Sequence, residues 1–172
     1  MESDQTTDIS DQPHLRQHDP DHTSLSPHHL GYDDMMGFIV RKHEGVSPFP
    51  YQDTAGKMTI GVGRNLTDRG LNAAEIDFLF ATDCALARTI LDSWWPAWQT
   101  APQGVQIALF SMAFNLGLPR LSGFVKMRDA LAKGEFQHAA SEALDSRWAS
   151  QVGHRADDVA ALMTGDMSCL LK

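Results

Sequence analysis

The sequence predicts a mostly helical α+β protein, with a small β-hairpin lobe, a larger helical lobe and a cleft between them. A strand-turn-strand pattern lies at residues 49–63, and segments with helical periodicity follow from residue 72. The 172 residues, 42% of them hydrophobic, can bury the core of a single domain. Because ligand clefts favour boundaries between lobes, we expect the functional site there.

Residues 1–34 differ in composition from the rest of the chain. They hold eight acidic residues against one arginine, and five of the eight histidines. Too few apolar side chains are present to offset the ordering entropy, so we expect a disordered acidic tail and a globular domain over residues 35–172. The histidines could bind a metal weakly, but no spacing matches a defined zinc site and a solvated tail is favoured. They are His14, His18, His22, His28 and His29.

The globular part opens with an amphipathic helix from Met35 that ends at Glu44, with Gly45 as its stop. Basic residues 41–43 suit the negative end of the helix dipole. Glu44 does not suit it, because the terminal carbonyls disfavour an ionised carboxylate, and this favours a general acid. The alternative is a surface glutamate beside a capping glycine.

A hairpin is expected next. Phe49–Tyr51 forms the first strand, Asp53–Gly56 the turn, and Lys57–Gly63 the returning strand. Asp53 is either a second functional carboxylate or a turn-forming aspartate, and Thr59 is either a functional hydroxyl or a β-branched strand residue.

Helices account for the remainder. Asn72 and Glu75 predict a capping box that opens a helix to about Leu91. A second helix is expected from Pro102 to Asn115, followed by stops at Gly117 and Pro119, and shorter ones at 122–132, 136–144, 147–151 and 156–163. The helix that opens after Asn72 should bury one stripe of apolar side chains: Ile76, Leu79, Phe80, Cys84, Ala87 and Leu91.

Glycosidases commonly place two carboxyl groups across the scissile bond, one protonated and one ionised. Glu44 and Asp53 fit this division, with the first shielded and the second on an exposed turn. The segment E-G-x5-Y-x-D-x-x-G-x-x-T-I-G-x-G, which begins at Glu44, resembles the T-even-like phage lysozymes, the endolysins of glycoside hydrolase family 24. Two later blocks, residues 110–117 and the S-R-W sequence at 146–148 followed by Arg155, extend the resemblance to about residues 35–172.

The resemblance implies a lysozyme-like fold and specific roles. Glu44 is the expected general acid, Asp53 the general base or water-orienting carboxylate, and Thr59 the hydroxyl that holds the attacking water. Family members generally invert the anomeric centre. The expected substrate-binding residues are Tyr51, Gly63, Phe114 and Asn115 along the groove, and Arg155 facing the catalytic glutamate.

Several of these residues have simpler alternatives. Phe110 and Phe114 lie four apart on one helical face and Trp148 is a large aromatic, so core packing would explain all three. Arg155 could be a solvated arginine near a helix start. The chain also departs from the family, with Arg64 where a histidine is frequent and a charged Glu142 where an amide is expected.

Charge and hydropathy limit the partners. The net charge of −8 lies mostly in residues 1–34, so the remainder lacks the basic excess that nucleic acid binding requires. No segment approaches the about 18 apolar residues that span a bilayer, and no signal peptide is recognisable, so we expect no stable membrane insertion. Cys84 and Cys169 are expected to be reduced, with a disulfide as the alternative after export.

The leading hypothesis is a monomeric endolysin-like muramidase that needs no metal or other cofactor. It would be made in the host bacterial cytoplasm and would cleave the β-1,4 bond between N-acetylmuramic acid and N-acetylglucosamine in periplasmic peptidoglycan, after passage through a holin pore. The alternatives are an antibacterial effector or virion-associated muramidase delivered by secretion or particle machinery, and a peptidoglycan-binding protein without turnover.

Overall fold

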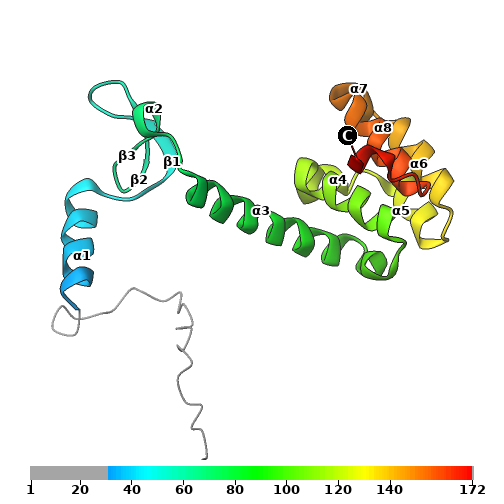
Figure 1. Cartoon of the computed structure of the whole chain (residues 1–172), viewed down its shortest axis with the longest axis horizontal. Coiled ribbons are helices and arrows are strands. Elements are labelled where there is room, and N and C mark those ends of the chain that lie inside the picture. The colour runs from blue at the N-terminus through cyan, green and yellow to red at the C-terminus, as the bar shows by residue number, and fades with distance from the viewer. Residues whose placement is uncertain (1–30, 172) are drawn as a thin grey trace, which may run out of the picture. The chain divides into compact units, whose positions relative to one another are not determined.

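The computed structural model describes residues 31–171, and the chain divides into two compact units, residues 1–70 and 71–172 (Figure 1). The structure describes each unit by itself. Helices predominate and one small antiparallel sheet is present, which confirms the predicted lysozyme-like α+β class. Residues 1–30 of the predicted disordered tail lie outside the described part of the chain.

Residues 31–70 of the first unit form two helices and a three-stranded sheet. Its elements are α1 (Tyr32–Glu44), β1 (Ser47–Gln52), β2 (Met58–Gly61), β3 (Arg64–Asn65) and α2 (Leu66–Arg69), with strand order β1-β2-β3. The helix α1 begins three residues before the predicted start, so residues 32–34 do not belong to a disordered tail. Two aspartates suit its first turn, and Asp34 Oδ2 accepts a hydrogen bond from the Gly31 N–H at 3.3 Å.

The predicted hairpin is confirmed, with Tyr51 opposite Thr59. Its register shifts between Ser47 and Tyr51. Two prolines, Pro48 and Pro50, occupy this stretch, and proline cannot donate to a strand ladder. The sequence did not predict β3 and α2, which are only two and four residues long.

The second unit is a helical bundle. Its elements are α3 (Ala73–Trp94), η2 (Pro96–Thr100), α4 (Gln103–Leu121), α5 (Val125–Ala132), α6 (Phe136–Leu144), α7 (Arg147–Val152), α8 (His154–Met163) and η3 (Ser168–Leu171). The capping box of Asn72 and Glu75 and the predicted order of helices are confirmed. Gly104 lets α4 approach α8 closely, because a methyl group there would overlap the carbonyl oxygen of Leu162.

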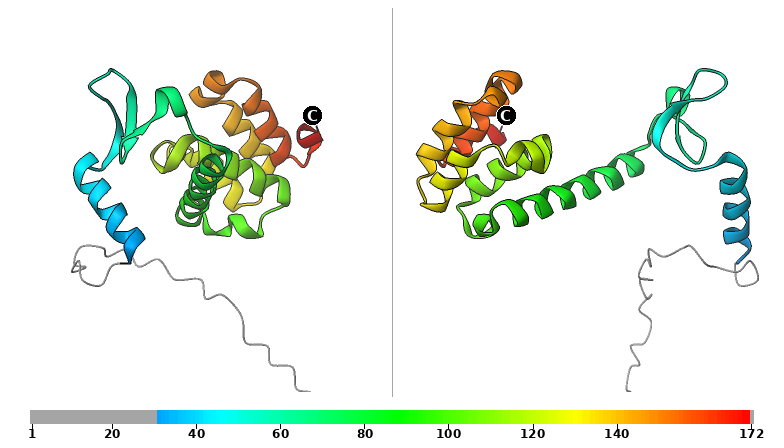
Figure 2. Two further views of the ribbon diagram at one scale, coloured as in Figure 1. Left: turned by 60° about the vertical axis from the view of Figure 1, so that its left-hand side comes forward. Right: turned by 180° about the vertical axis from the view of Figure 1, so that it is seen from behind.

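The stripe predicted for α3 is only partly buried. Ala87 and Leu91 lie in the core, but Ile76 and Phe80 remain 52% and 57% exposed and Leu79 is also exposed. The reason is visible in the right-hand view of Figure 2, where the bundle gathers around the C-terminal part of α3. The spacing of the apolar residues therefore predicted the helix correctly. It also predicted a longer buried stretch of the helix than the second unit covers.

The predicted stop at Gly117 is a break rather than an end. Gly117 adopts φ 65° and ψ 170° inside α4, and a further helical turn containing Pro119 continues to Leu121. Among the described residues no single helix meets the criteria for a membrane span. Helices α4 and α5, with a bend of 119° between them, are long and apolar enough only when they are taken together.

Candidate active site

Glu44 is the last residue of α1, as predicted. The chain turns immediately after it, since Gly45 has φ 73° and its N–H donates to the carbonyl oxygen of Arg41 at 2.9 Å. Within its own unit the side chain of Glu44 is exposed, so residues 31–70 do not provide the shielding predicted from the sequence. No residue in that range forms a hydrogen bond or ion pair with its carboxyl group.

Gly63 lies directly against the Glu44 carboxyl group. A Cβ atom at this position would lie 3.1 Å from Glu44 Oε2, which is tighter than ordinary van der Waals contact. Gly63 also has φ 69°, in the left-handed region that favours glycine. The turn between β2 and β3 therefore reaches the carboxyl group because a glycine stands here, and Gly63 is brought to the predicted acid.

Asp53 forms the hairpin turn and also keeps a carboxylate oxygen available. Its Oδ1 accepts hydrogen bonds from the N–H groups of Ala55 at 2.9 Å and Lys57 at 2.8 Å. Its Oδ2 has no hydrogen bond within the described part of the chain. The turn-forming alternative is thus correct, and it does not compete with a role in proton transfer because the two oxygens are used differently.

Thr59 is the sole buried residue of the first unit's described part, with 3% of its surface exposed. Its hydroxyl donates to the carbonyl oxygen of Lys57 at 3.3 Å, and the same oxygen accepts from the Asp53 N–H at 3.0 Å. The backbone of Lys57 therefore bonds to both groups: its N–H donates to the Asp53 carboxylate and its carbonyl oxygen accepts from the Thr59 hydroxyl. Tyr51 pairs with Thr59 across the strands, which places both side chains on one face of the sheet.

The corner that carries Arg64 is held by hydrogen bonds to the backbone. Its guanidinium group donates to the carbonyl oxygen of Gly70 from Nε at 3.2 Å and from Nη2 at 2.7 Å. The start of β2 is also bound to α2, because Lys57 Nζ lies 3.0 Å from Asp68 Oδ1 and the Met58 N–H donates to Thr67 Oγ1 at 2.9 Å. These contacts fix the strand that carries Thr59.

The predicted groove residues Phe114 and Asn115 lie on α4 in the second unit. The Phe114 ring is 43% exposed, packs 5.9 Å from the ring of Phe80, and borders a hollow of about 250 Å³ between α3 and α4. Asn115 is half-buried, and its Oδ1 accepts a hydrogen bond from Trp148 Nε1 at 2.9 Å. Packing thus accounts for part of the Phe114 environment, and Asn115 has a structural role that the sequence did not reveal.

The remaining predicted groove residue, Arg155, is exposed near the start of α8. Its predicted approach to Glu44 and the predicted cleft between the lobes stay predictions. Trp148 is buried and meets the Phe124 ring edge-on at 6.0 Å, which confirms the core interpretation of this residue. Cys84 and Cys169 are free thiols.

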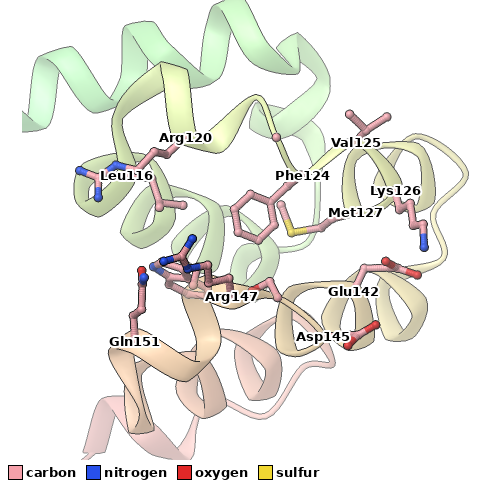
Figure 3. A pocket seen from close by; sticks show the side chains of 13 residues that line it. Leu116, Arg120, Phe124, Val125, Lys126, Met127, Glu142, Asp145, Arg147 and Gln151 are labelled. Carbon is pink, nitrogen blue, oxygen red and sulfur yellow. The ribbon is translucent and has the colours of Figure 1, made fainter.

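A larger cavity of about 740 Å³ lies in the second unit, where the end of α4, α5, α6 and α7 meet (Figure 3). It is lined by apolar side chains and by several charged ones, including Arg120, Lys126, Glu142 and Arg147. The sequence singled out Glu142 only as a departure from the family. Arg147 belongs to the S-R-W sequence, but Arg120 and Lys126 carried no motif, because the helix packing that brings the lining residues together is non-local.

The described part of the first unit carries all three residues that the sequence predicted for catalysis, Glu44, Asp53 and Thr59. A glutamate, a carboxylate with one uncommitted oxygen and a buried hydroxyl lie on a helix end, a turn and a strand within residues 31–70. No group of three or more His, Cys, Asp or Glu side chains suited to a metal ion occurs among residues 31–171.

Comparison with known proteins agrees with this chemistry. The phage lysozyme family profile matches residues 41–164. The chain is also similar to the pre-baseplate central spike protein Gp5 of Enterobacteria phage T4, with 28% identity over 161 residues. That alignment covers 77% of this chain, and the chain spans about 28% of the length of the spike protein. Because the family profile covers most of the sequence, the chain belongs to the phage lysozyme family, a family of glycosidases that hydrolyse peptidoglycan.

Proposed function

We propose that this protein is a muramidase that cleaves the β-1,4 bond between N-acetylmuramic acid and N-acetylglucosamine by general acid/base catalysis. Family membership supports the substrate class. The observation that carries the assignment of residues is the environment of the hairpin. Gly63 packs on the Glu44 carboxyl group, and the Lys57 backbone joins Asp53 to Thr59.

Each group has a distinct step. Glu44 gives its proton to the glycosidic oxygen as the bond from that oxygen to the anomeric carbon breaks. A water molecule adds to the anomeric carbon, and its proton passes to the uncommitted Oδ2 of Asp53. The Thr59 hydroxyl donates to the Lys57 carbonyl oxygen, so its lone pairs can accept a hydrogen bond from that water. Attack from the opposite face would invert the anomeric centre.

The test is the release of reducing ends from purified, chloroform-treated Gram-negative sacculi. Wild-type protein should release them, and Glu44→Gln and Asp53→Asn should each reduce the rate by about 10²- to 10⁴-fold, the usual contribution of an acid or base. Glu135→Gln, at the exposed N-cap position of α6, is the matched control and should not change the rate. Activity of Glu44→Gln near wild type would remove Glu44 from the mechanism. Binding to sacculi without release would indicate a wall-binding protein.

A second context for the same chemistry is a muramidase delivered with a phage particle or by secretion machinery. The similarity to a central spike protein favours it over free release through a holin pore. In either context we propose synthesis in a bacterial cytoplasm and action on peptidoglycan in the periplasm.

Deletion of residues 1–30, which keeps the whole of α1, separates the two contexts. The truncated protein should hydrolyse purified sacculi as well as the full chain does. Loss of the protein from purified particles after this deletion would support delivery by a particle. Particle fractions that never contain the full-length chain would exclude that context and favour free release.

A further inference from the structure

Lys57, which closes the hairpin turn, carries a cation next to the proposed base Asp53. Its N–H donates to Asp53 Oδ1 at 2.8 Å, and its carbonyl oxygen accepts from the Asp53 N–H at 3.0 Å. This exchange continues the ladder one pair beyond Gln52 and Met58, so the Lys57 and Asp53 side chains share one face of the hairpin. The flexible stem of the lysine could therefore bring its ammonium group to the uncommitted Oδ2 of Asp53.

The ammonium group is instead paired with α2. Lys57 Nζ lies 3.0 Å from Asp68 Oδ1, and Asp53 forms no ion pair within the described part of the chain. An ammonium group at Asp53 Oδ2 would occupy the oxygen that takes the proton from water in the proposed mechanism. The pairing with Asp68 therefore leaves that oxygen open.

Asp68 is fixed by contacts of its own. Asn65 Nδ2 donates to Asp68 Oδ2 at 3.0 Å, and the Asp68 N–H donates to Asn65 Oδ1 at 2.9 Å. Since Asn65 is the N-cap of α2, these two bonds hold the carboxylate at the start of that helix. With Oδ2 bonded to Asn65, the other oxygen of Asp68 faces the ammonium group.

The ion pair itself should contribute little to folding. The side chains of Lys57 and Asp68 are 41% and 55% exposed, and water screens pairs as exposed as this one. The start of β2 also keeps a bond to α2 that does not involve Asp68, because the Met58 N–H donates to Thr67 Oγ1 at 2.9 Å. The loss of the Asp68 charge should therefore affect the rate of hydrolysis more than the stability.

We propose that Asp68 is a positioning residue of the muramidase reaction, and that it acts by holding the Lys57 ammonium group away from Asp53 Oδ2. The proposal rests on the proposed function and adds to it a residue that touches neither the glycan nor the attacking water. Removal of the Asp68 charge alone would free the ammonium group to bond to Asp53. Removal of both charges would leave Oδ2 open again, which a purely structural role of Asp68 would not predict.

The test is a double-mutant cycle on the release of reducing ends from purified sacculi, with the full-length protein. Asp68→Asn, which keeps an acceptor for Asn65, should lower the rate about tenfold, the factor expected for displacing one charge-assisted hydrogen bond. In a Lys57→Met background the same substitution should change the rate by less than about twofold, because no ammonium group remains. Equal losses in the two backgrounds, or no loss in either, would overturn the proposal.

Asp157→Asn is the matched control, because Asp157 is another exposed aspartate beside a basic side chain, with its Oδ2 3.6 Å from Nδ1 of His154. It should leave the rate unchanged in the wild-type and Lys57→Met backgrounds. Thermal unfolding shows whether each variant folds. Asp68→Ser, which also removes the charge, replaces Asp68→Asn if the latter does not fold.

A crystal structure of Asp68→Asn tests the contact without hydrolysis. Lys57 Nζ should lie within ion-pair distance, about 4 Å, of Asp53 Oδ2 in the variant, and should remain with Asp68 in the wild type. A wild type that releases no reducing ends would overturn the proposed function and this role with it. An active wild type, together with a variant in which the ammonium group stays away from Asp53, would overturn this role alone.

Discussion

The hairpin region of the first unit and the helical bundle of the second are stabilised in different ways. Every buried hydrophobic residue in the described part of the chain lies at or beyond Ala87, in the bundle. Residues 45–70 instead bury only Thr59 and are held by turns, backbone hydrogen bonds and a guanidinium-carbonyl contact. The proposed catalytic groups lie in the region that depends least on a hydrophobic core.

This difference indicates how function and stability divide between the two regions. Polar contacts of fixed geometry can position a carboxylate, as the two backbone N–H groups that bond to Asp53 Oδ1 do, while Glu44 Oε2 is placed only by its proximity to Gly63. Apolar packing supplies most of the folding free energy but sets no single direction for a polar atom. Substitutions in the hairpin should therefore change activity more than stability, and substitutions in the bundle should do the reverse.

Apart from the proposed acid and base themselves, the largest effect is expected for Gly63→Ala. The added methyl group would lie 3.1 Å from Glu44 Oε2 and should displace the carboxyl group, which can cost about 10²-fold in rate. Gly61→Ala is the control, since Gly61 has nearly the same φ, 67° against 69°, with nothing near its Cβ position. Both variants should lose about 1–2 kcal/mol of stability from the left-handed backbone. Equal activity losses, measured beside thermal unfolding, would argue against the contact.

Two substitutions at Thr59 distinguish the contribution of its hydroxyl group from that of its methyl group. Thr59→Val keeps the shape but removes the hydroxyl, and should lower the rate at least about tenfold, the loss expected for one hydrogen bond to water. Its stability should change little, because the Lys57 carbonyl oxygen still accepts from the Asp53 N–H. Thr59→Ser should do the opposite, with most activity kept and some stability lost. Initial rates and unfolding midpoints of the pair measure this.

In the bundle, Asn115→Ala should act on stability. It removes the acceptor of the Trp148 indole N–H and leaves a buried donor unpaired, which costs about 1–3 kcal/mol. Adding Trp148→Phe to the Asn115→Ala variant removes the donor as well. Chemical denaturation of the two single variants and the double variant should give a coupling free energy that differs from zero. Additive losses would show that the hydrogen bond contributes nothing.

The smallest effect concerns acid stability. The indole N–H of Trp98 and then the amide of Gln99 donate to Asp92, and they lower the pKa of that carboxyl group below its usual 3.8. A lowered folded-state pKa gives stability that is present above about pH 4 and is lost as the pH falls through the folded-state value. In thermal scans, Asp92→Asn should therefore weaken the dependence of the unfolding midpoint on pH between pH 4 and pH 2. An unchanged slope would contradict this assignment.

Local sequence signals predicted the hairpin turn and the helix end correctly because both are built from local contacts. Asp53 bonds to the backbone two and four residues ahead, and Gly45 and Gly56 adopt the positive φ values that their turns require. The residues of such a turn are contiguous, so their pattern survives in the sequence. The helix end that carries Glu44 was predicted for the same reason, through its capping glycine.

Contacts between distant helices could not be predicted in this way. The bond between Asn115 and Trp148 spans 33 residues, and Arg120 and Glu142 share a cavity only because α4 and α6 pack in one bundle. Periodicity also misjudged α3, since Phe80 repeats with the core residues although the bundle covers only the C-terminal part of the helix. An amphipathic stripe predicts a buried face but not which neighbour covers it.

The most direct test of the proposed acid/base mechanism is hydrolysis of purified sacculi in water enriched in ¹⁸O, with mass spectrometry of the released muropeptides. Addition of water to the anomeric carbon predicts hydrated muramic acid ends that carry one ¹⁸O atom, and Glu44→Gln should release almost none. Unlabelled anhydro ends would contradict the mechanism, because they would mean that the muramic acid's own hydroxyl, rather than water, had attacked.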